Sequence, residues 1–147
     1  MRNYLIALAY FCLLTLTSPV SAGLLLVTPT EAALPAGDIP AMRGITRGPS
    51  IELASPNPGI KSVKSPFDFK VRFLPHSGST IDLSSVQVLY VKTPTVNLTQ
   101  RMATYISDKG ISVTGAQVPP GEHTVVVSVA DSSGRRGTSV MVINVVE

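Results

Sequence analysis

The segment that most restricts the fold of this chain is Phe67-Asp-Phe-Lys-Val-Arg-Phe73, in which apolar and charged residues alternate without exception. Successive side chains of an extended strand point to opposite faces, so four apolar side chains would share one face and three charged ones the other. In a helix the same aromatic residues would be spread around the whole circumference. The segment therefore predicts a β-strand with one face on a hydrophobic core and the other in water.

Other short apolar runs follow this pattern and are separated by turn residues. The further predicted strands cover residues 50–54, 86–92, 111–118, 123–130 and 138–146. Residues 86–92 carry apolar side chains at both odd and even positions, which predicts a strand whose two faces are both covered. Gly115 interrupts residues 111–118, which predicts an edge or bulged strand.

Residues 97–107 depart from the strand pattern, because their apolar side chains recur at helical spacing. They predict one short helix with Asn97 as its N-cap and Gly110 close after its end. Several short strands, regular turn signals and a single short helix predict an all-β fold, an antiparallel β-sandwich of about seven strands. We place this domain at residues 49–147.

The chain begins with the features of a secretory signal. Residues 1–22 contain a basic start at Arg2, an apolar run at 4–16, and Val20-Ser21-Ala22, which matches the small-x-small cleavage pattern. The apolar run is too short to cross a bilayer, which needs roughly 20 residues. We expect an exported bacterial protein, periplasmic or secreted. An uncleaved anchor stays as the alternative because apolar residues continue at 24–27, and only that form would contact a membrane.

Cleavage after Ala22 would also remove Cys12, the only cysteine of the chain. The mature chain would then form no disulfide and offer no thiolate to a reaction or a metal. Residues 23–48 are rich in Pro, Gly and Ala without a sustained period, which predicts a flexible spacer. The alternative is a docking segment that becomes ordered on a partner.

The stretch from Pro119 to Gly137 contains the most chemically suggestive residues. Glu122 and His123 are neighbours, and neighbours on a strand point to opposite faces, so they predict a surface polar pair where a turn enters a strand. Residues 131–137 lack the acidic residues of a calcium loop, the three glycines of a dinucleotide fingerprint and the helices around a nucleic-acid clamp. They predict a hairpin loop in which Asp131 binds the amides of the turn.

Other kinds of chemistry have less support in the sequence. His76 and His123 are the only histidines, and their separation lacks the close ligand spacing of most metal sites. No nucleophile motif of a hydrolase occurs. The 12 basic and 9 acidic residues are scattered, whereas nucleic-acid binding favours a basic stripe with interleaved aromatic residues. We therefore expect no enzymatic activity, no cofactor and no nucleic-acid partner.

Two stretches carry a resemblance to a known family. The sequence PGEHTVVVSVADSSGRRG, followed by a valine-rich last strand, resembles the closing hairpin of bacterial immunoglobulin-like and fibronectin-III-like domains. The sequence SPNPGIKSVKSPFDFKVRF resembles the way such domains open. The likeness covers about residues 49–147 and implies an immunoglobulin-like β-sandwich.

The same region is distantly similar to copper-resistance CopC-like sandwiches. That resemblance would imply copper ligands that include a histidine at the mature N-terminus. The predicted mature start here is Gly23-Leu24-Leu25, so the copper ligands are not matched.

These observations predict a non-catalytic exported module, binding or structural, that contacts a protein or another component of the cell envelope. The expected contact routes are an exposed edge strand and the loops at one end of the sandwich. Within those loops the candidate contact residues are Ser77, Gly78, Arg135 and Arg136. The alternative is a small periplasmic, copper-type metal carrier that uses His76 and His123.

Overall fold

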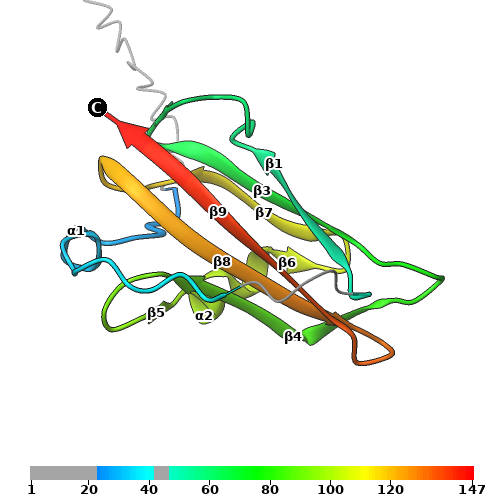
Figure 1. The fold of residues 1–147 in the computed structure, drawn as a ribbon. Coiled ribbons are helices and arrows are strands. Elements are labelled where there is room, and N and C mark those ends of the chain that lie inside the picture. The colour runs from blue at the N-terminus through cyan, green and yellow to red at the C-terminus, as the bar shows by residue number, and fades with distance from the viewer. Residues whose placement is uncertain (1–22, 42–46) are drawn as a thin grey trace, which may run out of the picture.

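The computed structural model describes residues 23–41 and 47–147, and the predicted signal at residues 1–22 lies outside them. Two β-sheets pack face to face as a sandwich (Figure 1). The strands are β1 (Ser50–Ser55), β2 (Val63–Lys64), β3 (Phe67–Leu74), β4 (Ile81–Tyr90), β5 (Val96–Asn97), β6 (Ile106–Ser107), β7 (Gly110–Ala116), β8 (Gly121–Asp131) and β9 (Arg136–Val146). One sheet has the order β1-β3-β7-β6 and the other the order β2-β9-β8-β4-β5. All neighbouring strands are antiparallel except β2 and β9, which are parallel.

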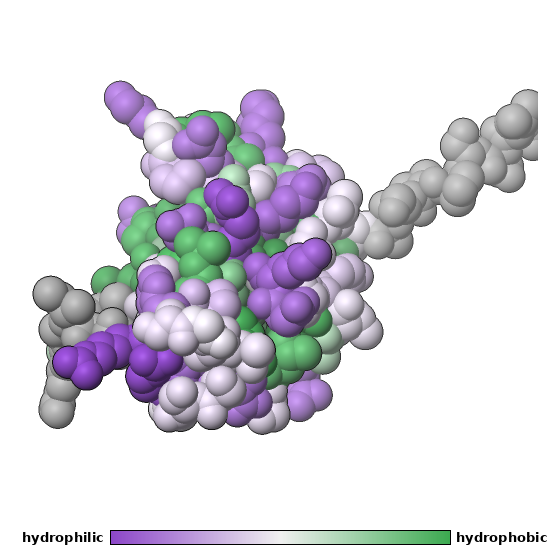
Figure 2. Space-filling model, turned by 90° about the vertical axis from the view of Figure 1, so that its right-hand side faces the viewer, coloured by the Kyte–Doolittle hydropathy of each residue, from purple (hydrophilic) through white to green (hydrophobic). Residues whose placement is uncertain are grey.

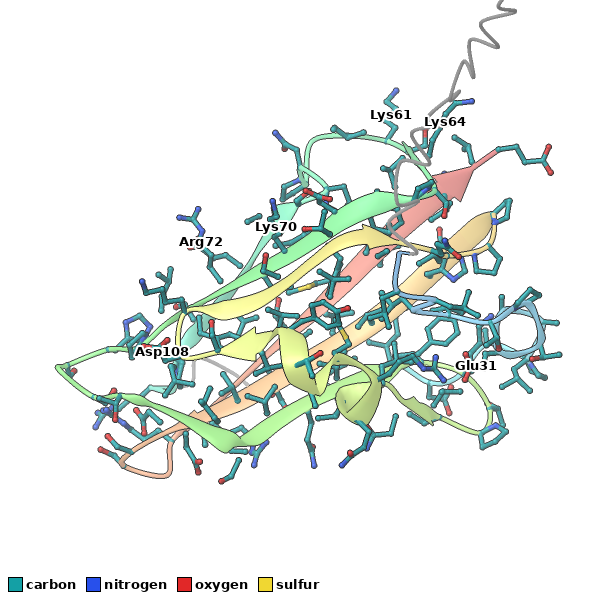
Figure 3. All side chains as sticks on the ribbon, turned by 180° about the vertical axis from the view of Figure 1, so that it is seen from behind. Glu31, Lys61, Lys64, Lys70, Arg72 and Asp108 are labelled. Atoms are coloured by element: carbon teal, nitrogen blue, oxygen red, sulfur yellow. The ribbon has the colours of Figure 1, made fainter. Side chains whose placement is uncertain are left out.

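Strand β3 confirms the alternation seen in the sequence. Its four apolar side chains between Phe67 and Phe73 are all buried, while Lys70 and Arg72 project from the outer face of the sheet (Figure 3). On the opposite sheet, β8 directs Val125, Val127 and Val129 into the same core. Burial of these two apolar faces against each other stabilises the sandwich through the hydrophobic effect. The described residues contain no cysteine, so no disulfide links them.

The closing hairpin was also predicted correctly. Strands β8 and β9 pair over ten successive residues, from Gly121 opposite Val145 to Ala130 opposite Arg136. The turn between them runs through Gly134, whose φ of +75° lies in the left-handed region that favours glycine.

Other strands differ from their predictions. The structure has nine strands rather than about seven, because β2, β5 and β6 are two residues long and too short to leave a sequence pattern. Gln87 is exposed, so β4 is not covered on both sides as predicted. Strand β7 lies between β3 and β6 instead of at an edge, but the predicted bulge is present as a register shift between Phe67 and Phe69 of β3.

The predicted helix at 97–107 is real but shorter. Helix α2 spans Thr99–Met102 and continues as the 3-10 helix η1 (Ala103–Tyr105). The Asn97 side chain accepts a hydrogen bond from the Thr99 amide at 2.9 Å, although the helix is capped at Leu98. Leu98 and Met102 are fully buried, so the helix closes one side of the core.

Residues 23–48 were predicted to be a flexible spacer, but the first part of this segment is folded onto the sandwich. Residues 24–37, which we call the N-terminal strap, pack onto the sandwich and include helix α1 (Pro29–Ala32) (Figure 1). Leu26 and Val27 are only 3% and 1% exposed, because they fill the opening between the two sheets. The composition suggested a linker, but this apolar pair makes the strap part of the folded domain.

Candidate binding surface

The two loops that the sequence identified as contact regions lie together at one end of the sandwich. The amide of Ser132 donates to the Thr80 carbonyl at 2.9 Å, and the amide of Thr80 donates to the Ser132 hydroxyl at 3.2 Å. These bonds bring the turn with Ser77 and Gly78 next to the β8–β9 turn. Figure 2 looks onto this end and shows mostly hydrophilic side chains around scattered apolar ones.

Arg135 is held by its own chain in this loop. Its guanidinium binds the buried carboxylate of Asp131 through Nε at 2.9 Å and Nη2 at 2.8 Å. Asp131 also accepts the amides of Ser133 and Arg135, as predicted for this turn. Burial raises the pKa of Asp131, but the hydrogen bonds from Arg135 and Ser133 outweigh that effect and leave the pKa below its ordinary value. The Arg135–Asp131 pair therefore stabilises the turn.

Arg136 is more accessible than Arg135. It is exposed and donates through Nη1 to the Ser128 hydroxyl at 3.2 Å and to the Ser85 carbonyl at 3.4 Å. Of the four predicted contact residues, the exposed Ser77, Gly78 and Arg136 thus remain open to a partner.

His123 is not on the surface, which corrects the prediction of a surface polar pair. It is 3% exposed and points into the core, while its neighbour Glu122 is exposed, so the predicted opposite orientation is confirmed. The imidazole lies 2.9 Å from the Tyr90 hydroxyl through Nδ1 and 2.7 Å from the Pro119 carbonyl oxygen through Nε2. Burial lowers the pKa of His123, the Pro119 hydrogen bond partly opposes this effect, and the nearby charge of Lys92 lowers the pKa further.

The structure does not bring His76 and His123 together. His76 lies in the turn after β3, where its Nε2 is 2.8 Å from the Ser50 hydroxyl. That turn is at the Asp131 end of β8, whereas His123 is near the other end of β8, eight residues or roughly 26 Å away at the rise of an extended strand. Among the described residues, no three His, Cys, Asp or Glu side chains are grouped as a metal site would require. A shared two-histidine site is therefore not formed.

A second surface lies beside β9 and was not found from the sequence. Strand β9 pairs with β8 along its length, but β2 covers only Val145 and Val146 on its other side. Along residues 138–144 no described strand is paired with that outer edge in the sheet, although β1 packs against β9. The connection from β1 to β2 passes nearby and leaves a groove of about 230 Å³.

We call this surface the β9-edge groove. It is lined by Leu53, Pro56, Asn57, Pro58, Ile60, Lys61, Ser62, Val63, Glu122, Val142, Ile143 and Asn144. Ile60 and Val142 are 57% and 55% exposed, so two large apolar side chains face water beside an unpaired strand edge. Lys61 and Glu122 place one charge of each sign at its border. The groove lies between the β1–β2 connection, which contains Ser55-Pro-Asn-Pro-Gly59, and strand β9.

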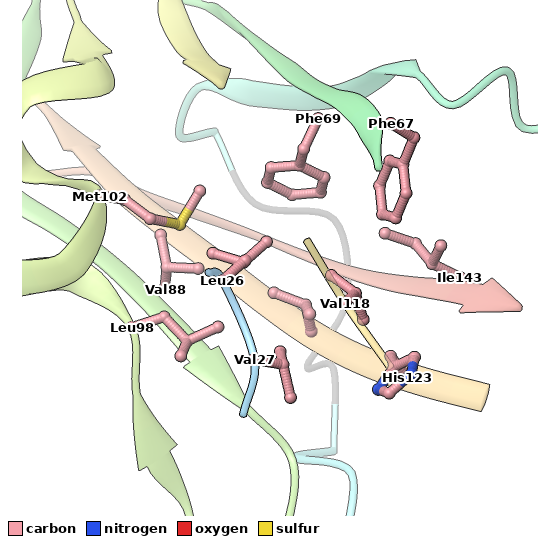
Figure 4. Close-up of a pocket in the computed structure, with 11 residues that line it drawn as sticks. Leu26, Val27, Phe67, Phe69, Val88, Leu98, Met102, Val118, His123 and Ile143 are labelled. Atoms are coloured by element: carbon pink, nitrogen blue, oxygen red, sulfur yellow. The ribbon is translucent and has the colours of Figure 1, made fainter. Parts of the chain in front are cut away.

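The arrangement of these residues offers a surface for contact. The cavity inside the core measures about 10 Å³, room for about one water molecule, and is lined by apolar side chains and His123 (Figure 4). No helix in the described part of the chain has the length and apolar character needed to cross a membrane. Comparisons of the chain with models of protein families, with curated proteins and with solved structures find no match.

Proposed function

We propose that this chain is an exported, non-catalytic, immunoglobulin-like module that binds a protein of the cell envelope by accepting an extended segment at the β9-edge groove. The single observation that carries the proposal is the unpaired edge of β9 beside the exposed Ile60 and Val142. A strand edge provides backbone donors and acceptors, and neighbouring apolar side chains provide selectivity for the segment that pairs with it.

The strand order supports an immunoglobulin-like fold. In such sandwiches one sheet has the order A-B-E-D and the other contains C, F and G. Here β1-β3-β7-β6 matches the first sheet, and β9-β8-β4 matches G-F-C, with β5 at the C side. The match extends to the corner before β8. There His123 binds a backbone carbonyl four residues upstream, as a tyrosine commonly does at this corner.

The two charged side chains that line the groove have opposite signs, which favours a mainly apolar, strand-like partner. Lys61 and Glu122 balance each other, so long-range attraction contributes little to encounter. Backbone pairing and contact with Ile60 and Val142 would supply most of the affinity. The loop end, with Ser77, Gly78 and Arg136, offers a second contact for the same partner.

The test uses the chain from residue 23 onward, immobilised and exposed to envelope extract, followed by binding of the captured protein in pure form. Val142→Lys places a second positive charge in the groove, which Lys61 also lines, and is expected to weaken binding at least tenfold. Leu83→Lys is the matched control, because Leu83 is also an exposed apolar residue, 48% exposed, on strand β4. Its binding should equal that of the unmodified chain.

Equal binding by the Val142→Lys and Leu83→Lys variants would contradict the groove as the contact site. Weaker binding by Arg136→Glu alone would move the contact to the loop end. Turnover of ester, peptide or glycan substrates by the purified chain would contradict a non-catalytic role.

A further inference from the structure

We propose that the N-terminal strap of one copy of this chain seats in the sandwich of a second copy, which gives a strand-exchanged dimer. The proposal is independent of the β9-edge groove, because it involves other residues at another part of the surface. It follows from how the strap is held, what it covers and how it is connected to the rest of the domain.

The strap is bound as a separate apolar strand. Gln117, just after β7, donates its amide to the Leu24 carbonyl at 2.8 Å and accepts the Leu26 amide at 3.0 Å. Leu25 and Gln117 thereby form a parallel bridge. Leu26 and Val27 line the core cavity beside Val118 and His123 (Figure 4). The sandwich therefore contains a built receptor site for this apolar segment.

Polar contacts fix the position of the strap after Val27. The Glu31 carboxylate binds Arg101 of helix α2 with two hydrogen bonds of 2.9 and 3.0 Å, and Arg101 also donates to the Leu26 carbonyl at 2.6 Å. Lys92 donates to the Ala32 carbonyl at 2.9 Å. The site thus selects an apolar pair followed by a carboxylate, and the sequence of a second copy meets these requirements because it is identical.

The connection after the strap is long enough to allow exchange. Gly37 donates to the carbonyl of Val91, and Val91 donates to Thr124 of β8. The other end, Gly48, lies against Arg136, which pairs with Ala130 of β8. Six residues of β8 separate these positions, or about 20 Å, whereas the eleven steps from residue 37 to residue 48 can extend to about 36 Å.

The side chains of residues 38–41 are all exposed, and Ile39 is 54% exposed. Moving them therefore uncovers no buried core. The contacts of the strap are the same within one copy and between two copies, so chain concentration decides between the two forms. Because residues 38–47 connect the strap to the rest of its own chain, the strap has an effective concentration on the order of 1 mM within that chain. We expect exchange at chain concentrations near 1 mM and little at about 10 μM.

Two single-cysteine variants of the chain from residue 23, Leu25→Cys and Gln117→Cys, test this directly. Both positions are exposed, and bridged residues on neighbouring strands are close enough for a disulfide. The two variants are mixed at 1 mM, warmed mildly to release the strap, cooled and oxidised. Non-reducing electrophoresis should show a disulfide-linked dimer of the two variants that is at least fivefold less abundant after the same treatment at 10 μM.

The matched control mixes Leu25→Cys with Ser112→Cys, an exposed position on β7 that has no bridge to the strap. This pair reports random collision, and a yield equal to that of the Gln117→Cys pair would overturn the proposal. The double variant Leu25→Cys/Gln117→Cys at 10 μM should form an intrachain disulfide, which shows that the geometry permits the bond. With that bond formed, no dimer at 1 mM would also overturn the proposal.

Glu31→Gln provides a kinetic test. It weakens the strap contact equally within one copy and between two copies, so it should speed exchange severalfold without changing the final share of dimer. An unchanged rate would contradict release of the strap as the step that limits exchange.

Discussion

The hydroxyl oxygen of Tyr90 lies 2.9 Å from Nδ1 of His123 in the interior of the sandwich. On its other side the ring contacts the carbonyl oxygen of Pro119 through Nε2. Because a carbonyl oxygen only accepts, Nε2 carries the proton and Nδ1 accepts from the phenol. The neutral histidine thus pairs with the buried Tyr90 hydroxyl and the partly buried Pro119 carbonyl, and it ties β4 to the corner before β8.

Replacing Tyr90 with Phe removes the donor but keeps most of the packing. The Nδ1 atom of His123 would then be buried without a partner, so the free energy of unfolding should fall by about 1–3 kcal/mol. Urea denaturation followed by circular dichroism measures this change. Tyr105→Phe is the control, since Tyr105 is 37% exposed, and it should change stability by less than about 0.5 kcal/mol. Equal losses in both variants would show that the hydrogen bond contributes nothing.

The buried histidine should also make the fold sensitive to mild acid. Its pKa is lowered by burial, while the unfolded chain has the ordinary value of 6.5. The unfolded state therefore binds more protons below pH 6.5, and the stability from the neutral histidine is lost as the pH falls through its folded pKa. The free energy of unfolding should decline between pH 7 and pH 5.

The range from pH 7 to pH 5 lies above the ordinary pKa values of carboxylates. Glu31, whose pKa Arg101 lowers from 4.5 to about 2, loses its contribution only below pH 4.5. His123→Phe should remove most of the decline between pH 7 and pH 5, and His76→Ala should keep it because His76 is exposed. A decline that persists in His123→Phe would assign the pH dependence to another group.

Two adjacent leucines test whether the strap belongs to the domain. Leu26 is 3% exposed in the core, whereas Leu25 is 46% exposed. Leu26→Ala should reduce the free energy of unfolding by about 2–4 kcal/mol, because it leaves a cavity between the sheets. Leu25→Ala should change it by less than about 0.5 kcal/mol. Thermal and urea unfolding of both variants measure the difference, and a flexible spacer would give two equally small effects.

The sequence predicted the sandwich where local pattern and tertiary packing require the same residues. In β3 the alternation from Phe67 to Phe73 records directly which side chains are buried. In the β8–β9 hairpin, Asp131 and Gly134 are turn residues for local reasons, namely amide binding and a positive φ. Such features can be read without knowing what lies across the core.

The features that the sequence did not predict depend on contacts between distant residues. His123 is buried because Tyr90, 33 positions away, supplies a hydrogen bond, and the sequence contains no local sign of that partner. The composition of residues 23–48 predicted a spacer that includes Leu26 and Val27, and only the opening beside Val118, seen in the fold, places these two side chains in the core. The β9-edge groove likewise needs a two-residue strand, β2, that carries no periodicity.

Gly110, at the start of β7, is a position where the backbone itself requires glycine. Its φ is +143°, and a Cβ atom there would overlap the carbonyl oxygen of Val71 on β3. Gly110→Ala should therefore cost more than about 3 kcal/mol, because backbone strain and a clash with the neighbouring strand act together. Gly78 is the matched control: its φ is +69°, but nothing lies within 4 Å of the added atom. Gly78→Ala should cost about 1–2 kcal/mol, the left-handed strain alone. Equal losses in the two variants, measured by urea unfolding, would mean that β3 and β7 can separate at this point without loss of stability.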